Sequence, residues 1–144
     1  MRQVLLLLFV AGTCIAAQPS DDAVKKELKL FHGKWACVGG QGMDGKPVAE
    51  DEIKRTSMVV EGNKFSIKQN DNVIIEGTFT VDPTKKIKTI DVDLKKPGEG
   101  KVLGIYQIDG DMRKSCFATN DAKGRPDGFR KEAGYLILEW KRAK

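Results

Sequence analysis

Much of the chain alternates apolar and polar residues with a period of two, which is typical of strands that bury one face. In Lys64–Gln69, for example, Phe65 and Ile67 alternate with polar side chains. Turn-forming pairs such as Gly62-Asn63 and Asp109-Gly110 separate neighbouring segments. The pattern predicts eight strands: Lys34–Val38, Thr56–Glu61, Lys64–Gln69, Val73–Val81, Ile90–Leu94, Val102–Ile108, Met112–Phe117 and Tyr135–Arg142.

A helix is predicted ahead of the first strand. Ser20 can cap it, and the two acids that follow complement the helix dipole in the first turn. Val24, Leu28 and Phe31 recur at helical spacing, and the charged residues between them, Lys25, Lys26, Glu27 and Lys29, are expected to face water. We expect this short helix to end at Gly33 and to pack across one opening of the β-domain.

Short connections between most strands favour an antiparallel meander, and eight strands are enough to close a barrel. The two ends of the chain support closure. Gly33 and Trp35 open the first strand, and Trp140 and Arg142 close the last. We predict that the Arg142 guanidinium covers the Trp35 ring and seals the helix-covered end. The expected fold is mostly β, an eight-stranded antiparallel up-and-down (lipocalin-like) barrel; a two-sheet sandwich is the competing architecture.

The first 17 residues have the pattern of a signal peptide. Arg2 supplies a positive start, Val4–Val10 is apolar, and Ala11–Ala17 is small and weakly polar. The apolar part is shorter than the roughly 20 residues that a membrane-spanning helix needs. We therefore expect cleavage and a secreted or periplasmic protein without a transmembrane segment, in which residues 18–33 form the helical segment and residues 34–144 the barrel.

Charge and cysteine content narrow the classes of partner. The formal net charge of +5 is spread along the chain, whereas nucleic-acid binding calls for a clustered basic face. We expect no nucleic-acid partner and a monomer. Cys37 and Cys116 fall on strands two positions apart in a closed barrel, about 9–10 Å by the inter-strand spacing. A disulfide needs Cα atoms within about 7 Å, so free thiols are predicted.

Several segments, in this order and spacing, match a known pattern. They are Leu-x-x-Phe-His-Gly-Lys-Trp at Leu28–Trp35, Asp44-Gly45-Lys46, Lys88–Asp91, Gly104-Ile105-Tyr106, Gly110-Asp111, Cys116, Arg125-Pro126 with Phe129, and Lys141-Arg142. Together they resemble an uncharacterised secreted family best known from planctomycete bacteria, whose members are described as lipocalin-like barrels. The resemblance implies the fold and the secreted location, and it brings no function.

One strand departs from that family, which tends to carry apolar residues where this chain has Arg113 and Ser115. Two interpretations follow. Either the two side chains place polarity against an otherwise apolar interior, or the strand is turned so that both face water.

Catalytic and metal-binding patterns are absent from the sequence. His32 is the single histidine, and no Ser or Cys motif is arranged around it. The cysteines lack zinc-ligand spacing, and no glycine-rich stretch has the lysine of a phosphate loop. Asp91 and Asp93 lie out of phase with the apolar residues of their strand, so they are expected to point outward. We predict a non-enzymatic protein without metal or cofactor.

A barrel cavity is the leading functional hypothesis, and its ligand would be small and apolar or amphipathic. Tyr106 is expected as a polar contact near a mouth, Arg125 as a fork for an anionic headgroup, and Arg113, Phe65 and Phe79 as further contacts. The loops Gly39–Lys54 and Ala118–Ala133 would form the rim. The interior residues are expected to be Met58, Val60, Phe65, Ile67, Val73, Ile75, Phe79, Ile90, Val92, Leu136 and Leu138.

The alternative is a module that binds another envelope protein through the same two loops. It would have a filled interior and an exposed apolar patch around Phe129 or Met43.

Overall fold

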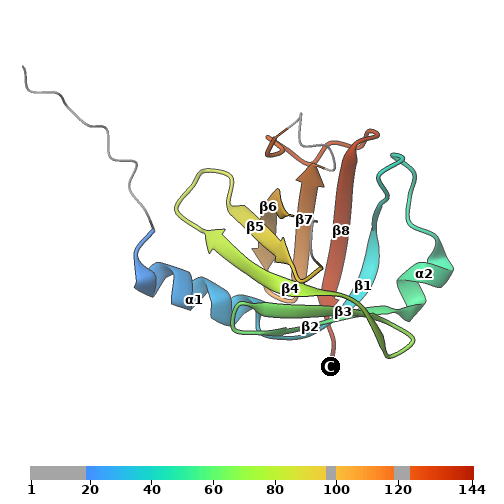
Figure 1. The fold of residues 1–144 in the computed structure, drawn as a ribbon, viewed down its shortest axis with the longest axis horizontal. Coiled ribbons are helices and arrows are strands. Elements are labelled where there is room, and N and C mark those ends of the chain that lie inside the picture. Colours follow the sequence, from blue (N-terminus) through green and yellow to red (C-terminus); the bar gives the residue numbers. More distant parts are fainter. Residues whose placement is uncertain (1–18, 97–99, 119–123) are drawn as a thin grey trace, which may run out of the picture.

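The computed structural model describes residues 19–96, 100–118 and 124–144, and shows one closed β-barrel with a helix at one end (Figure 1). Each strand pairs antiparallel with the next, and β8 returns to β1. The elements are α1 (Asp21–Phe31), β1 (Gly33–Gln41), α2 (Glu50–Arg55), β2 (Thr56–Glu61), β3 (Lys64–Gln69), β4 (Asn72–Asp82), β5 (Thr89–Leu94), β6 (Lys101–Asp109), β7 (Met112–Ala118) and β8 (Tyr135–Arg142). The predicted fold class is confirmed, while the predicted signal peptide lies outside the described residues.

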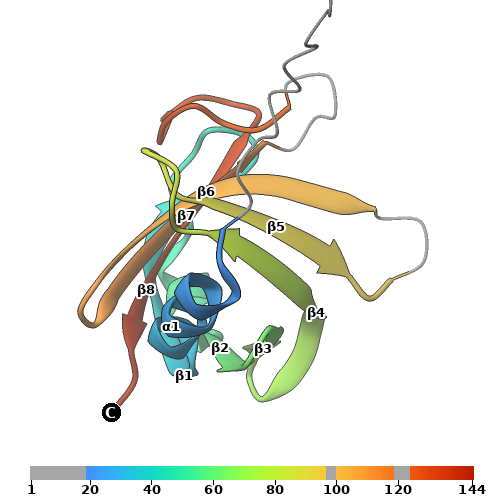
Figure 2. The same ribbon diagram turned by 90° about the vertical axis from the view of Figure 1, so that its left-hand side faces the viewer.

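Helix α1 begins where the sequence predicts. Ser20 accepts a hydrogen bond from the backbone N–H of Ala23 at 3.3 Å, and Phe31 at the other end is fully buried. The helix lies across the end of the barrel (Figure 2). The expectation that Glu27 faces water is wrong, because Glu27 is three residues after Val24 and four before Phe31 and therefore shares their buried face.

The predicted closure between the chain ends is confirmed. Trp35 pairs in register with Arg142, and the guanidinium carbon lies 4.4 Å from the centre of the indole ring. Arg142 also donates hydrogen bonds to the last carbonyls of α1, from Nη1 to His32 at 2.7 Å and from Nη2 to Leu30 at 2.8 Å. Gly33 has a φ of 121°, and a Cβ there would lie 3.1 Å from Arg142 Nη1. A glycine at this position therefore lets the guanidinium reach the helix end.

Strand β1 is longer than predicted, and the connection after it contains a helix. The strand continues to Gln41, whose amide donates to the carbonyls of Glu132 at 2.9 Å and Tyr135 at 3.0 Å. The expected irregular loop Gly39–Lys54 is therefore wrong at both ends. Its last part belongs to α2, which has acids in the first turn and bases in the last, as the helix dipole favours.

The start of β4 departs from simple alternation. Ile67 pairs with Ile75, but Lys68 pairs with Val73, so the register shifts by one residue at a bulge. Val73 is 50% exposed as a result, and its predicted inward orientation is wrong. Beyond the bulge the predicted phase returns, and Phe79 and Val81 are buried.

Both cysteines described by the structure are free and buried, as predicted. Strand alternation gives a second reason why the two cysteines form no disulfide, in addition to the distance between their strands. Cys37 belongs to the interior cluster, whereas Cys116 packs with Ile105 and Ile137 on the outer side of the wall, beneath Phe129. Burial raises the pKa of both thiols, so neither is an activated nucleophile at neutral pH.

Candidate ligand-binding site

The barrel encloses a cavity of about 390 Å³, which is within the size range of small-molecule sites. Nine of the eleven predicted interior residues line it; Val60 is in the core below, and Val73 is exposed. The apolar lining residues are Met43, Met58, Phe65, Ile67, Ile75, Phe79, Ile90, Val92, Leu94, Val102, Leu103, Phe117, Ala118, Leu136, Leu138 and Trp140, and the others are Lys101, Arg113, Ser115 and Gly124.

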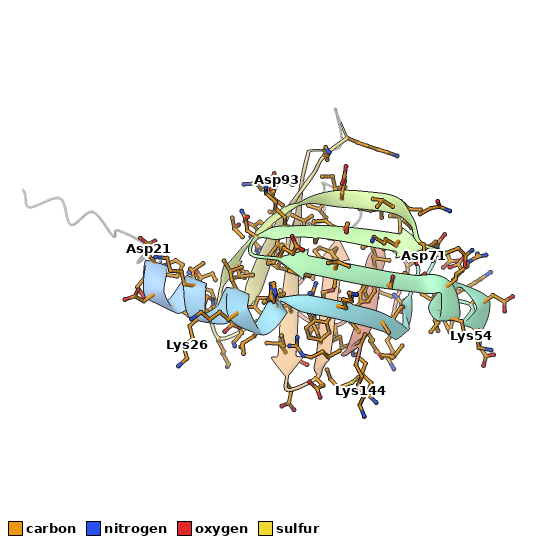
Figure 3. The ribbon with its side chains drawn as sticks, turned by 90° about the horizontal axis from the view of Figure 1, so that it is seen from below. Asp21, Lys26, Lys54, Asp71, Asp93 and Lys144 are labelled. Atoms are coloured by element: carbon orange, nitrogen blue, oxygen red, sulfur yellow. The ribbon has the colours of Figure 1, made fainter. Side chains whose placement is uncertain are left out.

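The cavity reaches the surface at the end opposite α1. Met43, Lys101 and Gly124 line it there and are exposed; Met43 follows β1, Lys101 begins β6, and Gly124 is in the connection before β8. In an up-and-down barrel these connections all lie at one end. The charged side chains of Lys26 and Asp93 project away from the barrel (Figure 3), and Asp93 is exposed as predicted. Among the described residues, the barrel has a floor closed by α1, and the cavity reaches the surface at the opposite end, which we call the mouth.

Arg113 and Ser115 face the interior, so they place polar groups against the apolar cavity wall and do not face water. Their exposed fractions are 7% and 1%. The guanidinium carbon of Arg113 lies 4.6 Å from the ring centre of Phe31 and 5.7 Å from that of Trp35. Since Phe31 and Trp35 form the floor, Arg113 lies at the deep end of the cavity.

The polar atoms at this deep end are not all paired. Nη2 of Arg113 donates a weak hydrogen bond to Met58 Sδ at 3.8 Å. Its Nε and Nη1, with Ser115 Oγ and Trp140 Nε1, are buried without a hydrogen-bond partner among the described residues. Burial lowers the pKa of Arg113 to about 9 by desolvation of the charged form, which leaves the guanidinium charged at neutral pH.

Tyr106 faces inward but lies under α1, not at the mouth where it was expected. Its hydroxyl donates to Glu27 Oε1 at 2.8 Å, and Lys88 Nζ lies 2.8 Å from the same oxygen. Desolvation and the carboxylate together raise the pKa of Tyr106. Tyr106 therefore attaches the helix to the barrel wall and is not part of the cavity lining.

Arg125, expected as a headgroup contact, is engaged elsewhere. Its Nη1 lies 2.6 Å from Asp91 Oδ1 and donates to the carbonyl of Gly104 at 2.8 Å. Asp91 is on the outer face of β5, as predicted. Arg125 thus fastens the β7–β8 connection to the outside of the wall.

The two predicted phenylalanines both line the cavity. Their ring centres are 6.3 Å apart, and Phe79 lies 5.3 Å from Phe31 of α1. Aromatic packing is therefore continuous from the cavity wall to the helix.

Other kinds of site receive no support from the part of the chain that the structure describes. No group of three or more His, Cys, Asp or Glu side chains there is placed to hold a metal ion. No helix there is long and apolar enough to span a membrane.

Comparisons of the chain with protein-family models, with curated proteins and with solved structures found no match. The resemblance to a secreted lipocalin-like family stays a prediction. A functional conclusion for this chain rests on the geometry of its cavity.

Proposed function

We propose that the protein is a secreted or periplasmic, non-enzymatic binding protein that holds a small apolar or amphipathic molecule inside its barrel. The observation that supports this function is the cavity of about 390 Å³, lined mainly by apolar side chains, which among the described residues reaches the surface at the end opposite α1. Transfer of apolar ligand surface from water into such a cavity is favourable by about 25 cal/mol per Å².

The wall around the cavity is preformed, which favours binding. Every strand is hydrogen-bonded on both sides, and the floor is fixed by the contact of Arg142 with Trp35 and α1. A ligand therefore does not have to order the site when it binds, and little of its binding free energy is spent on reorganisation. The predicted signal peptide supports the location.

The alternative, a protein-binding module, has one observation in its favour. Near the mouth, Met43, Ile74 and Ile75 are 60%, 42% and 41% exposed. The alternative also requires a filled interior, and the cavity argues against it. Phe129, the other residue expected in an exposed patch, packs against the outer cluster with Lys114 Nζ 4.9 Å from its ring.

Binding of the neutral apolar fluorophore N-phenyl-1-naphthylamine tests the proposal. We expect saturable fluorescence enhancement at one probe per chain, and displacement of the probe by 1-dodecanol. Leu138→Trp places a larger side chain in the cavity and should weaken probe binding about tenfold or more, because each kcal/mol lost lowers affinity several-fold. Lys141→Trp adds the same side chain on the exposed outer face of β8 and serves as the matched control.

A wild-type protein that gives no enhancement, or a Leu138→Trp variant that binds the probe as well as the wild type does, refutes a cavity ligand.

A further inference from the structure

The deep end of the cavity contains a buried positive charge without a buried negative partner. Arg113 is 7% exposed, and no carboxylate among the described residues forms an ion pair with it. A buried charge is costly unless it is paired and hydrogen-bonded. The rings of Phe31 and Trp35 offset part of this cost through cation–π contacts, but they accept no hydrogen bond in the guanidinium plane.

Other unused donors lie beside this charge. Arg113 pairs across the strands with Trp140, and Ser115 follows two residues later on the same face of β7. The N–H groups at Arg113 Nε and Nη1, the Ser115 hydroxyl and the Trp140 Nε1–H all lack a partner among the described residues. All three side chains line the cavity. A cluster made of donors, one of them charged, suits an acceptor that carries negative charge.

The charged residues in the described cavity lining are all positive. They are Lys101 and Arg113, and no Asp or Glu is among the described lining residues. Lys101 is exposed at the mouth, where water screens its charge, whereas Arg113 is enclosed by aromatic rings. An anion gains most at the floor, because the local dielectric is lowest there.

We propose that the cavity holds an amphiphile with one carboxylate, whose headgroup binds Arg113, Ser115 and Trp140 at the floor and whose apolar tail extends toward the mouth. This inference rests on the proposed function and names the class of its ligand. The carboxylate supplies both the counter-charge and the acceptors that the described protein atoms do not. The tail contacts the ring of apolar side chains from Phe65 and Phe79 up to the rim.

Three probes with the same tail test the headgroup. Dodecanoate, 1-dodecanol and dodecylammonium are compared at neutral pH by displacement of N-phenyl-1-naphthylamine. We expect dodecanoate to bind about tenfold or more tightly than 1-dodecanol, because hydrogen bonds to charged groups are the stronger ones. Dodecylammonium should bind more weakly than either, since it places a second positive charge against Arg113.

Arg113→Met preserves an unbranched, mainly apolar side chain and removes the charge. It should lower the affinity for dodecanoate to about that for 1-dodecanol and change the affinity for 1-dodecanol far less, because a neutral hydroxyl gains less from the charge than a carboxylate does. Ser115→Ala should reduce the preference by a smaller factor, and it carries the test if Arg113→Met does not fold. Lys101→Met removes the other positive charge of the described lining, at the mouth, and should reduce the preference for dodecanoate much less than Arg113→Met does.

The outcomes separate the two proposals. Three outcomes refute the floor site and leave the cavity function standing: equal binding of dodecanoate and 1-dodecanol to the wild type, a preference that survives Arg113→Met, or a loss of preference in Lys101→Met as large as that in Arg113→Met. Failure of every probe to bind refutes both.

Discussion

Arg142 is the residue whose removal should damage the barrel floor most directly. Its guanidinium donates to the His32 and Leu30 carbonyls at the end of α1, where backbone acceptors have no partner within the helix. It also covers the Trp35 ring at 4.4 Å. We predict that Arg142→Met destabilises the protein strongly, although the residue is far from the mouth of the cavity.

These contacts give the size of the expected loss in the free energy of unfolding. A hydrogen bond to a charged group is worth about 1.5–3 kcal/mol, and a cation–π contact about 0.5–2 kcal/mol. The Asp111 ion pair adds little, because that carboxylate is 73% exposed. Since the Arg142 side chain is itself 32% exposed, we take the lower ends of these ranges, which give a loss of about 3.5 kcal/mol. For a domain of this size that loss lowers Tm by about 10–15 °C.

Thermal and urea unfolding, followed by tryptophan fluorescence, measure the loss. Arg142→Lys keeps the charge but lacks the planar group that reaches two carbonyls at once, so it should recover less than half of the stability. Arg130→Met is the matched control. Arg130 is exposed and pairs with the exposed Asp127, so its loss should shift Tm by no more than about 2 °C. A wild-type Tm for Arg142→Met, or full recovery by Arg142→Lys, contradicts the reasoning.

Two further substitutions test the contact between α1 and the barrel wall and the packing of β4 against β5. The pKa of Tyr106 is higher in the folded state than in the unfolded state. The contribution of Tyr106 to stability is therefore complete below the unfolded pKa and decreases above it. The free energy of unfolding should fall as pH rises past about 10. Tyr106→Phe should reduce this fall and cost about 1 kcal/mol at neutral pH, as measured by urea unfolding. Gly77→Ala should cost about 1–3 kcal/mol by the same measurement, because its Cβ would overlap the carbonyl oxygen of Asp93 in β5.

The controls for these substitutions are internal to the chain. Both cysteines also titrate at high pH, but they are present in the wild type and in Tyr106→Phe, so the difference between the two proteins isolates the phenol. An unchanged pH profile in Tyr106→Phe contradicts the assigned role. For Gly77, the control is Gly128→Ala, whose Cβ meets nothing within 4 Å; equal effects of the two substitutions contradict the packing explanation.

Strand order and closure were predictable because they depend on local signals. Hairpin turns such as Asp109-Gly110 fix which strands are neighbours, and period-two alternation fixes which side chains face inward. The phase of Trp35 and Arg142 followed from the same rule. The local signal for helix α2 is the run of three acids followed by two bases within Glu50–Arg55, which matches the helix dipole.

The roles of the polar residues were harder to predict, because each role depends on tertiary contacts with residues far away in the sequence. Alternation places Arg113, Ser115 and Phe117 on one face, and that shared phase could have indicated an inward Arg113. Tyr106 was correctly phased, but its position beneath the helix depends on Glu27, a tertiary contact between residues 79 positions apart. The salt bridge of Arg125 with Asp91 likewise depends on how the β7–β8 connection crosses the wall.

The pairing of β1 with β8 determines when the protein can fold. Trp35 meets Arg142 across nearly the whole length of the domain, and contacts this far apart in sequence make folding slow. Until β8 is available, β1 presents an open edge and α1 lacks the guanidinium that holds its last turn. A chain from which β8 has not yet emerged therefore has neither floor nor cavity, and the topology favours folding only once β8 is available to pair with β1.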